Sequence, residues 1–113
     1  MAKTTKTKKI ALSQKQLDAM IEEATVDCYS ADEERSGFFC CIEDNLELPF
    51  ETEVLGVKVT VEALDMNGAG EFLAICSSGK RKQKVPLLEL PLPTPAPKGH
   101  EWILAYRHWS IAD

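Results

Sequence analysis

The sequence predicts an α+β domain with acidic helices near the N-terminus, a small SH3-like β-barrel after them and an aromatic helix at the C-terminus. Apolar residues recur at helical spacing up to residue 48, alternate with polar residues between 50 and 90, and return to helical spacing after a proline-rich stretch. A chain of 113 residues is long enough for one domain with a modest core.

Residues 1–12 are predicted to be a disordered basic tail, because lysine and threonine dominate them. No apolar stretch typical of a secretory signal follows, and no segment approaches the roughly 20 apolar residues of a membrane span. We therefore expect a cytoplasmic protein without a membrane partner, in which residues 13–113 form a single domain. The four cysteines form no Cys-x-x-Cys motif, so free thiols are expected.

Residues 13–29 are predicted to form an amphipathic helix that Ser13 can cap. Its apolar positions repeat at i, i+3, i+4, i+7 and i+11, which places them on one face. These positions are Leu17, Met20, Ile21, Ala24 and Cys28.

A second helix is expected after Ser30, because Ser30 and Glu33 have the spacing of a capping box. The apolar run 38–42 fits either a continued helix or a short buried strand. We favour the helix, because the sequence Glu43-Asp44-Asn45 that follows is typical of a helix end. Pro49 then closes the helical region, which covers residues 13–48.

Residues 50–90 are predicted to form the small barrel. Three alternating segments supply its later strands: Val57–Leu64, Glu71–Cys76 and the basic segment Lys80–Leu88. The dipeptides Asn67-Gly68 and Ser78-Gly79 are turn signals between them. Short consecutive strands joined by tight turns are typical of a small, strongly bent barrel of the SH3 type.

Residues 91–99 hold four of the six prolines at alternate positions and are predicted to be an extended linker. Residues 100–111 are predicted to form the C-terminal helix, with Trp102, Tyr106 and Trp109 on one face. Such a face either packs on its own domain or binds a partner, and we favour packing.

Acidic residues are concentrated in residues 18–53. This segment holds twelve Asp and Glu residues against one base, Arg35, a formal charge of −11 in a chain whose net charge is −5. Crowded carboxylates repel one another, and a hard cation with oxygen ligands is their natural counter-charge. On composition alone, a solvated acidic surface is the simpler interpretation.

Standard site motifs do not explain the acidic segment. Residues 65–76 begin like an EF-hand loop, but they have alanine at the fifth position and cysteine at the twelfth, where a bidentate glutamate is needed. We interpret them as a hairpin turn. No Cys and His spacing matches a zinc site, and no catalytic constellation is recognisable, so no enzymatic activity is expected.

Residues 26–50 resemble the calcium-binding family known as CcbP, of the cyanobacterial type. The shared pattern is D-x-Y, an acidic run, a glycine with aromatics, an acidic pair and L-x-x-P-F. It falls on Asp27, Tyr29, Glu33, Gly37, Glu43, Asp44, Leu46, Pro49 and Phe50. Residues 85–87 and 105–109 are also similar to the family, so the resemblance begins near Asp27 and continues to the C-terminal helix.

The resemblance implies a cytosolic protein that binds Ca²⁺ through an acidic surface without an EF-hand, as a buffer or sensor. The carboxylates that we expect to bind Ca²⁺ are Asp27, Asp32, Glu33, Glu43, Asp44 and Glu47. On one continuous helix Glu33 and Asp44 would lie roughly 16 Å apart, so we expect two sites, one at the helix junction and one at the helix end. Half-exposed sites of this kind predict weak, salt-sensitive binding.

A competing interpretation is a protein- or nucleic-acid-interaction module that uses the small barrel and the basic segment 80–84. A basic run at a hairpin tip is most often a solvated turn. The neighbouring acidic segment also repels nucleic acid, so we do not expect nucleic acid as a partner. The sequence identifies no protein partner.

Overall fold

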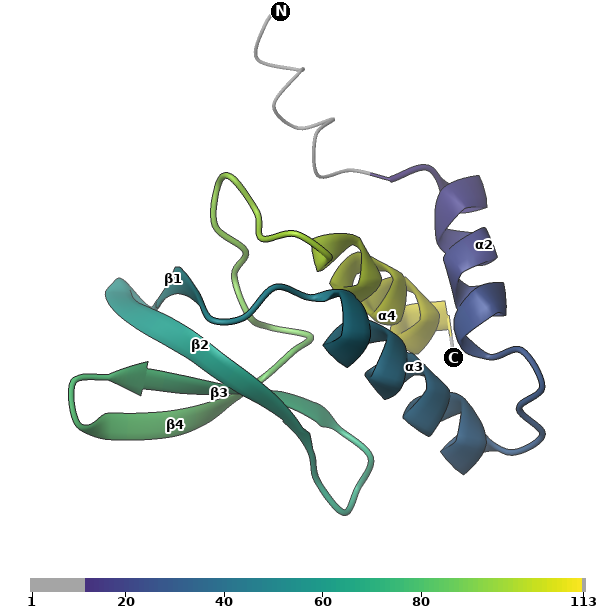
Figure 1. The fold of residues 1–113 in the computed structure, drawn as a ribbon, viewed down its shortest axis with the longest axis horizontal. Helices are drawn as coiled ribbons and strands as arrows, with labels where there is room; N and C mark the ends of the chain where they lie inside the picture. The colour runs from purple at the N-terminus through teal and green to yellow at the C-terminus, as the bar shows by residue number, and fades with distance from the viewer. Residues whose placement is uncertain (1–11, 113) are drawn as a thin grey trace, which may run out of the picture.

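The computed structural model describes residues 12–112 and shows an α+β fold (Figure 1). Its elements in chain order are α2 (Gln14–Ala24), α3 (Ala31–Asn45), β1 (Phe50–Val54), β2 (Val57–Met66), β3 (Phe72–Ser78), β4 (Arg81–Pro86) and α4 (His100–Ala112). The helices lie together on one side of the molecule, and the sheet lies on the other. Almost all of the predicted disordered tail lies outside the described residues.

Both N-terminal helices begin at the predicted caps. Ser13 Oγ accepts a hydrogen bond from the Gln16 amide at 3.1 Å, and Ser30 Oγ accepts one from the Glu33 amide at 3.1 Å. Helix α2 is shorter than predicted and ends at Ala24. Helix α3 continues without a break to Asn45, which confirms the helical interpretation of residues 38–42.

The four strands form one antiparallel sheet in the order β1-β2-β3-β4. The two-residue turn between β1 and β2 is made by Leu55 and Gly56, with φ values of 51° and 78°. In the next turn the Asn67 Oδ1 atom accepts the amides of Ala69 at 3.0 Å and Glu71 at 2.9 Å. This geometry confirms that the segment resembling the start of an EF-hand loop is a hairpin turn.

The predicted SH3-like barrel is not confirmed, because the sheet of the described chain is open and β1 and β4 form its two edges. The chain after β4 passes beside β1, where Thr52 Oγ1 donates a hydrogen bond to the Pro91 carbonyl oxygen at 2.7 Å. A proline has no N–H to donate to a neighbouring strand. The proline-rich segment therefore packs beside β1 without extending the sheet.

A β-bulge in β2 changes which of its residues are buried. The register pairs Val61 with Cys76 and Ala63 with Ile75, so the residue between Val61 and Ala63 is the extra one. Val61 is buried as the alternation predicts, but the next buried residue is Leu64 and not Ala63. The bulge therefore moves Leu64 to the core face.

Aromatic side chains connect the helices to the sheet. Phe38 of α3 packs against Trp102, Tyr106 and Trp109 of α4, with its ring stacked 4.9 Å from that of Trp109. Tyr106 also stacks on Phe72 of β3, with ring centroids 4.2 Å apart. These contacts confirm that the aromatic face of the C-terminal helix packs on its own domain. No helix in residues 12–112 is long and apolar enough to cross a membrane.

Candidate functional site

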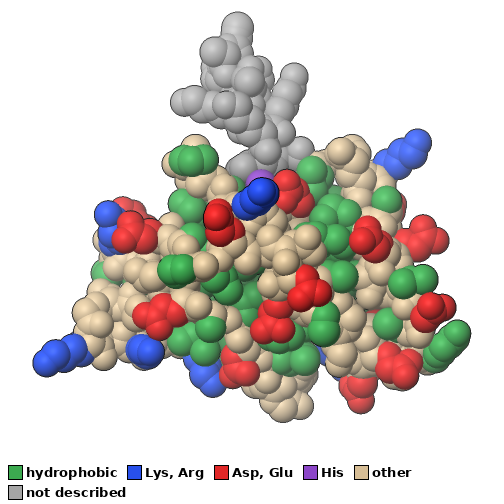
Figure 2. Space-filling model, viewed as in Figure 1, with side chains coloured by type: hydrophobic (Ala, Val, Ile, Leu, Met, Phe, Trp, Pro, Cys, Tyr) green, Lys and Arg blue, Asp and Glu red, His purple; other side chains and the backbone are tan. Residues whose placement is uncertain are grey.

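The acidic residues of the segment 18–53 lie on α2, on α3, in the loop between them, in the loop after α3 and on β1. Figure 2 shows that acidic side chains are spread over the face in view, between apolar and uncharged polar atoms. Within residues 12–112 no group of three or more His, Cys, Asp or Glu side chains is close enough to hold a metal ion. The six predicted ligands therefore do not form a complete ligand set in this conformation.

Three of the predicted ligands lie at the junction of α2 and α3. Asp27 belongs to the connecting loop and has a φ of 60°. Asp32 and Glu33 lie in the first turn of α3. Glu33 Oε1 accepts the Tyr29 amide at 2.6 Å, and Asp32 Oδ1 accepts Arg35 Nη1 at 2.9 Å. Two of the three carboxylates thus already have a partner within the chain.

The other three predicted ligands lie at the C-terminal end of α3. Glu43, Asp44 and Glu47 are exposed, and none of them forms an ion pair with another described residue. The Asn45 side-chain nitrogen donates to the Cys41 carbonyl at 2.8 Å, so only its Oδ1 atom could bind a cation. The end of a helix also carries the negative end of its dipole. This end of α3 is therefore the better-suited of the two places for a cation.

Two partly buried thiols lie in the negative field of these carboxylates. Burial raises the pKa of the Cys28 thiol, and the charges of Glu33, Glu34 and Asp27 raise it further. Burial also raises the pKa of Cys41, with contributions from Glu23 of α2 and Asp44 of α3. All four cysteines are free, as predicted.

Glu23, which is not among the six predicted ligands, also contributes negative charge near the helix end. It influences the same thiol as Asp44, although the two carboxylates belong to different helices. The available sequence signal was its spacing of four residues from Asp27, which makes two acidic residues neighbours on a helix. That signal concerned Asp27 alone, and it fails in the structure because α2 ends before Asp27.

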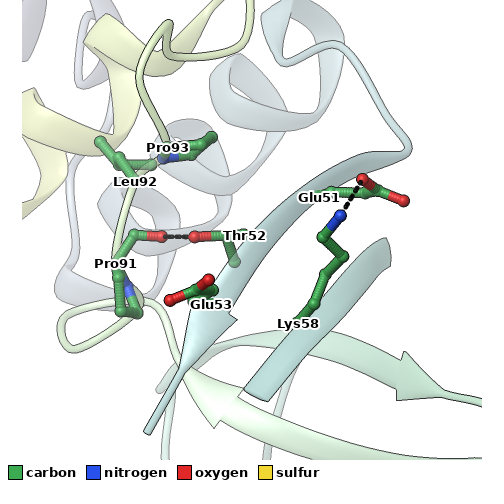
Figure 3. A pocket seen from close by; sticks show the side chains of 7 residues that line it. All are labelled: Glu51, Thr52, Glu53, Lys58, Pro91, Leu92 and Pro93. Carbon is green, nitrogen blue, oxygen red and sulfur yellow. Dashed lines mark hydrogen bonds and ion pairs between the residues drawn. The ribbon is translucent and has the colours of Figure 1, made fainter. Parts of the chain in front are cut away.

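A groove of about 410 Å³ lies beside β1, away from the predicted ligands (Figure 3). It is lined by Glu51, Thr52, Glu53, Lys58, Pro91, Leu92 and Pro93. Lys58 lies 3.7 Å from Glu51, so one of the two carboxylates already has a cation beside it. None of the six predicted ligands lines this groove.

The basic segment predicted as an alternative site is partly neutralised by the sheet itself. Lys82 lies 3.2 Å from Glu62, and Lys84 lies 3.0 Å from Asp65. The Ser77 hydroxyl and Lys82 lower the pKa of Glu62, and Lys84 with the Met66 amide lowers the pKa of Asp65. Two of the four basic side chains of this hairpin are therefore engaged with carboxylates.

The fold and the site define a small α+β protein with carboxylates at the ends of a helix and no EF-hand loop in its described part. The chain belongs to the calcium-binding family Calci_bind_CcbP, because the model of that family, described as calcium binding, matches residues 18–110. This match confirms the family resemblance and gives Ca²⁺ as the bound ion. Comparison with curated proteins and with solved structures gave no match.

Proposed function

We propose that this calcium-binding protein is a buffer or sensor that binds Ca²⁺ through the carboxylates of its acidic helical segment and catalyses no reaction. The observation that carries the proposal is the charge of −11 in residues 18–53, within a chain of a calcium-binding family. The ligands would be Asp27, Asp32 and Glu33 at the helix junction and Glu43, Asp44 and Glu47 at the helix end.

The helix end is the stronger of the two proposed sites. Its three carboxylates are exposed and have no cationic partner among the described residues. Ca²⁺ binds six to eight oxygens at about 2.3–2.6 Å, so water molecules would complete the ligand set. Because the carboxylates are exposed, salt should screen their attraction for the ion, which supports modest affinity.

A sensor role would require that Ca²⁺ changes how the helices pack. Glu23 of α2 and Asp44 of α3 both raise the pKa of Cys41, so neutralising their charges with Ca²⁺ would act on both helices. A buffer role would require no such change. The free thiols support a cytoplasmic location, because disulfides are rare in that compartment.

The alternative role as a nucleic-acid- or protein-interaction module has less support. That role would use the small SH3-like barrel and the basic hairpin, and the open sheet of the described residues gives no support to the barrel. Lys82 and Lys84 are paired with Glu62 and Asp65, which reduces the positive surface that could attract a phosphate backbone.

Titration calorimetry on the full chain, stripped of metal with a chelator, tests the proposal, with Mg²⁺ as the control ion. We expect a Ca²⁺-specific heat and a rise in melting temperature, because an ion that binds only the folded state stabilises it. The variant E43Q/D44N should lose much of the heat of Ca²⁺ binding. The control E51Q/E53Q removes the same number of charges from β1 and should keep the full heat of binding. Absence of any response to millimolar Ca²⁺ would show that the proposed function is wrong.

A further inference from the structure

Arg35 is the single base of the acidic segment, and it joins the helix junction to the sheet. Its Nη1 atom donates a hydrogen bond to Asp32 Oδ1 at 2.9 Å, and Asp32 lies in the first turn of α3. Its side chain also lies across Gly70 in the turn between β2 and β3. A Cβ atom on Gly70 would stand 2.8 Å from Arg35 Cδ and 2.9 Å from Nε. Arg35 thus contacts both a proposed calcium ligand and a turn of the sheet.

We propose that Arg35 is a built-in counter-cation of the helix junction, which occupies Asp32 until Ca²⁺ displaces it. In this role Arg35 lowers the calcium affinity of the junction. When Ca²⁺ displaces Arg35 from Asp32, the surroundings of Gly70 in the turn between β2 and β3 change as well. The inference rests on the proposed function, in which Asp32 is a calcium ligand.

The ion pair has the properties of a contact that a divalent ion can displace. The Asp32 side chain is 94% exposed and that of Arg35 is 38% exposed. Exposed ion pairs contribute little to stability and are screened by salt. Arg35 also makes a single hydrogen bond to Asp32, through one carboxylate oxygen, and not a two-bond fork.

The structure also provides space into which Arg35 can move. A hollow of about 270 Å³ lies between the start of α3 and the turn that follows β2. Its lining consists of Asp32, Arg35, Ser36 and residues 66–70. Movement of the guanidinium group within this hollow would change the surroundings of Gly70, because the two residues are in contact. Occupancy of Asp32 and the conformation of the turn are therefore linked through one side chain.

The expected size of the effect follows from Coulomb's law. A unit charge about 6 Å from a divalent ion in water-like surroundings changes the dissociation constant by about tenfold at low salt. Removal of the Arg35 charge should therefore tighten calcium binding at the junction by about that factor. The difference should shrink in concentrated salt, where the Debye length falls to a few ångströms.

The test is calcium titration of the full-length R35Q variant at low salt. Glutamine keeps a polar side chain as far as the δ position but carries no charge, and R35K keeps the charge. We expect about tenfold tighter binding for R35Q and near wild-type binding for R35K. The matched control is R81Q, which removes an exposed arginine from the β3–β4 hairpin and so changes the net charge equally. R81Q should change the affinity less than twofold.

A second measurement follows the amide signal of Gly70 by NMR during the same titrations. Calcium should shift this signal in the wild type and in R35K, and it should shift it much less in R35Q. Equal affinities and equal Gly70 shifts in R35Q and the wild type would overturn the inference. A wild type that binds no Ca²⁺, or a D32N variant that binds as the wild type does, would instead refute the proposed junction site. Thermal melts check that each variant is folded.

Discussion

Gly37 of α3 lies against the carbonyl oxygen of Ala24, the last residue of α2, so closely that a Cβ atom at Gly37 would overlap it. The same atom would stand 3.4 Å from Cys28 Sγ. A glycine inside a helix costs about 1 kcal/mol relative to alanine. Here the missing side chain allows α3 to pass directly beside the end of α2.

The substitution G37A should therefore destabilise the protein, although alanine favours helix more than glycine does. The overlap with a backbone atom forces α2 and α3 apart, and overpacking of this kind costs roughly 1–3 kcal/mol. Urea unfolding measures the effect. G68A is the matched control, because a Cβ atom on Gly68 would meet nothing within 4 Å. A G37A variant as stable as the wild type would show that α2 can move without cost.

Calcium should increase the reactivity of Cys28 and Cys41. Burial and, to a smaller extent, nearby carboxylates raise the pKa of both thiols, so a bound cation that neutralises those carboxylates should lower the pKa and raise the thiolate fraction. Alkylation with iodoacetamide near pH 8, followed by peptide mass spectrometry, measures the rate at each cysteine. Cys76 is the internal control, because burial alone raises its pKa. Equal rates with and without Ca²⁺ would argue against ions at these carboxylates.

The ion pairs of the sheet should contribute to the acid sensitivity of the fold. Their partners hold the pKa of Glu62 and that of Asp65 below the usual carboxylate values. The resulting stability is complete above the unfolded-state pKa and is lost as the pH falls through the lower folded-state values. Urea unfolding between pH 6 and pH 3 should therefore show a weaker pH dependence for E62Q/D65N than for the wild type. E89Q, which removes an exposed carboxylate without an ion pair among the described residues, should leave the pH dependence unchanged.

Local chemistry made much of the fold predictable. Ser13 and Ser30 cap their helices through their own side chains, and Asn67 closes its turn in the same way, so each feature depends on residues nearby in sequence. The bulge in β2 was not predictable from alternation, because it depends on pairing with β3. The predicted SH3-like barrel is not confirmed for a similar reason, since closure of the sheet depends on which segment lies beside β1.

The residue types of the candidate site were predictable, but their partners were not. The acidic run and the matching motif indicated carboxylates at both ends of α3. The contact of Arg35 with Gly70 joins residues far apart in sequence, and the joint effect of Glu23 and Asp44 on the pKa of Cys41 depends on how α2 packs on α3. These relationships arise from tertiary packing, and they decide which carboxylates are available to an ion.

The hydrogen bond from Thr52 to Pro91 should hold the proline-rich segment against the edge of the sheet. Thr52 is the only buried polar residue among the described residues, and its hydroxyl donates to the Pro91 carbonyl at 2.7 Å (Figure 3). T52V keeps the shape of the side chain but leaves this carbonyl without its donor, which should cost about 1–2 kcal/mol.

Urea unfolding of T52V measures that cost, and T52S should recover part of the stability because serine keeps the hydroxyl. The matched control is T60V, a partly buried threonine of β2 whose side chain makes no hydrogen bond to another described residue. If T52V and T60V were equally stable, the bond to Pro91 would contribute nothing, and packing of Leu90 and Leu92 alone would hold the segment in place. If only T52V had a lower free energy of unfolding, the Thr52 hydroxyl would be shown to hold the proline-rich segment beside β1.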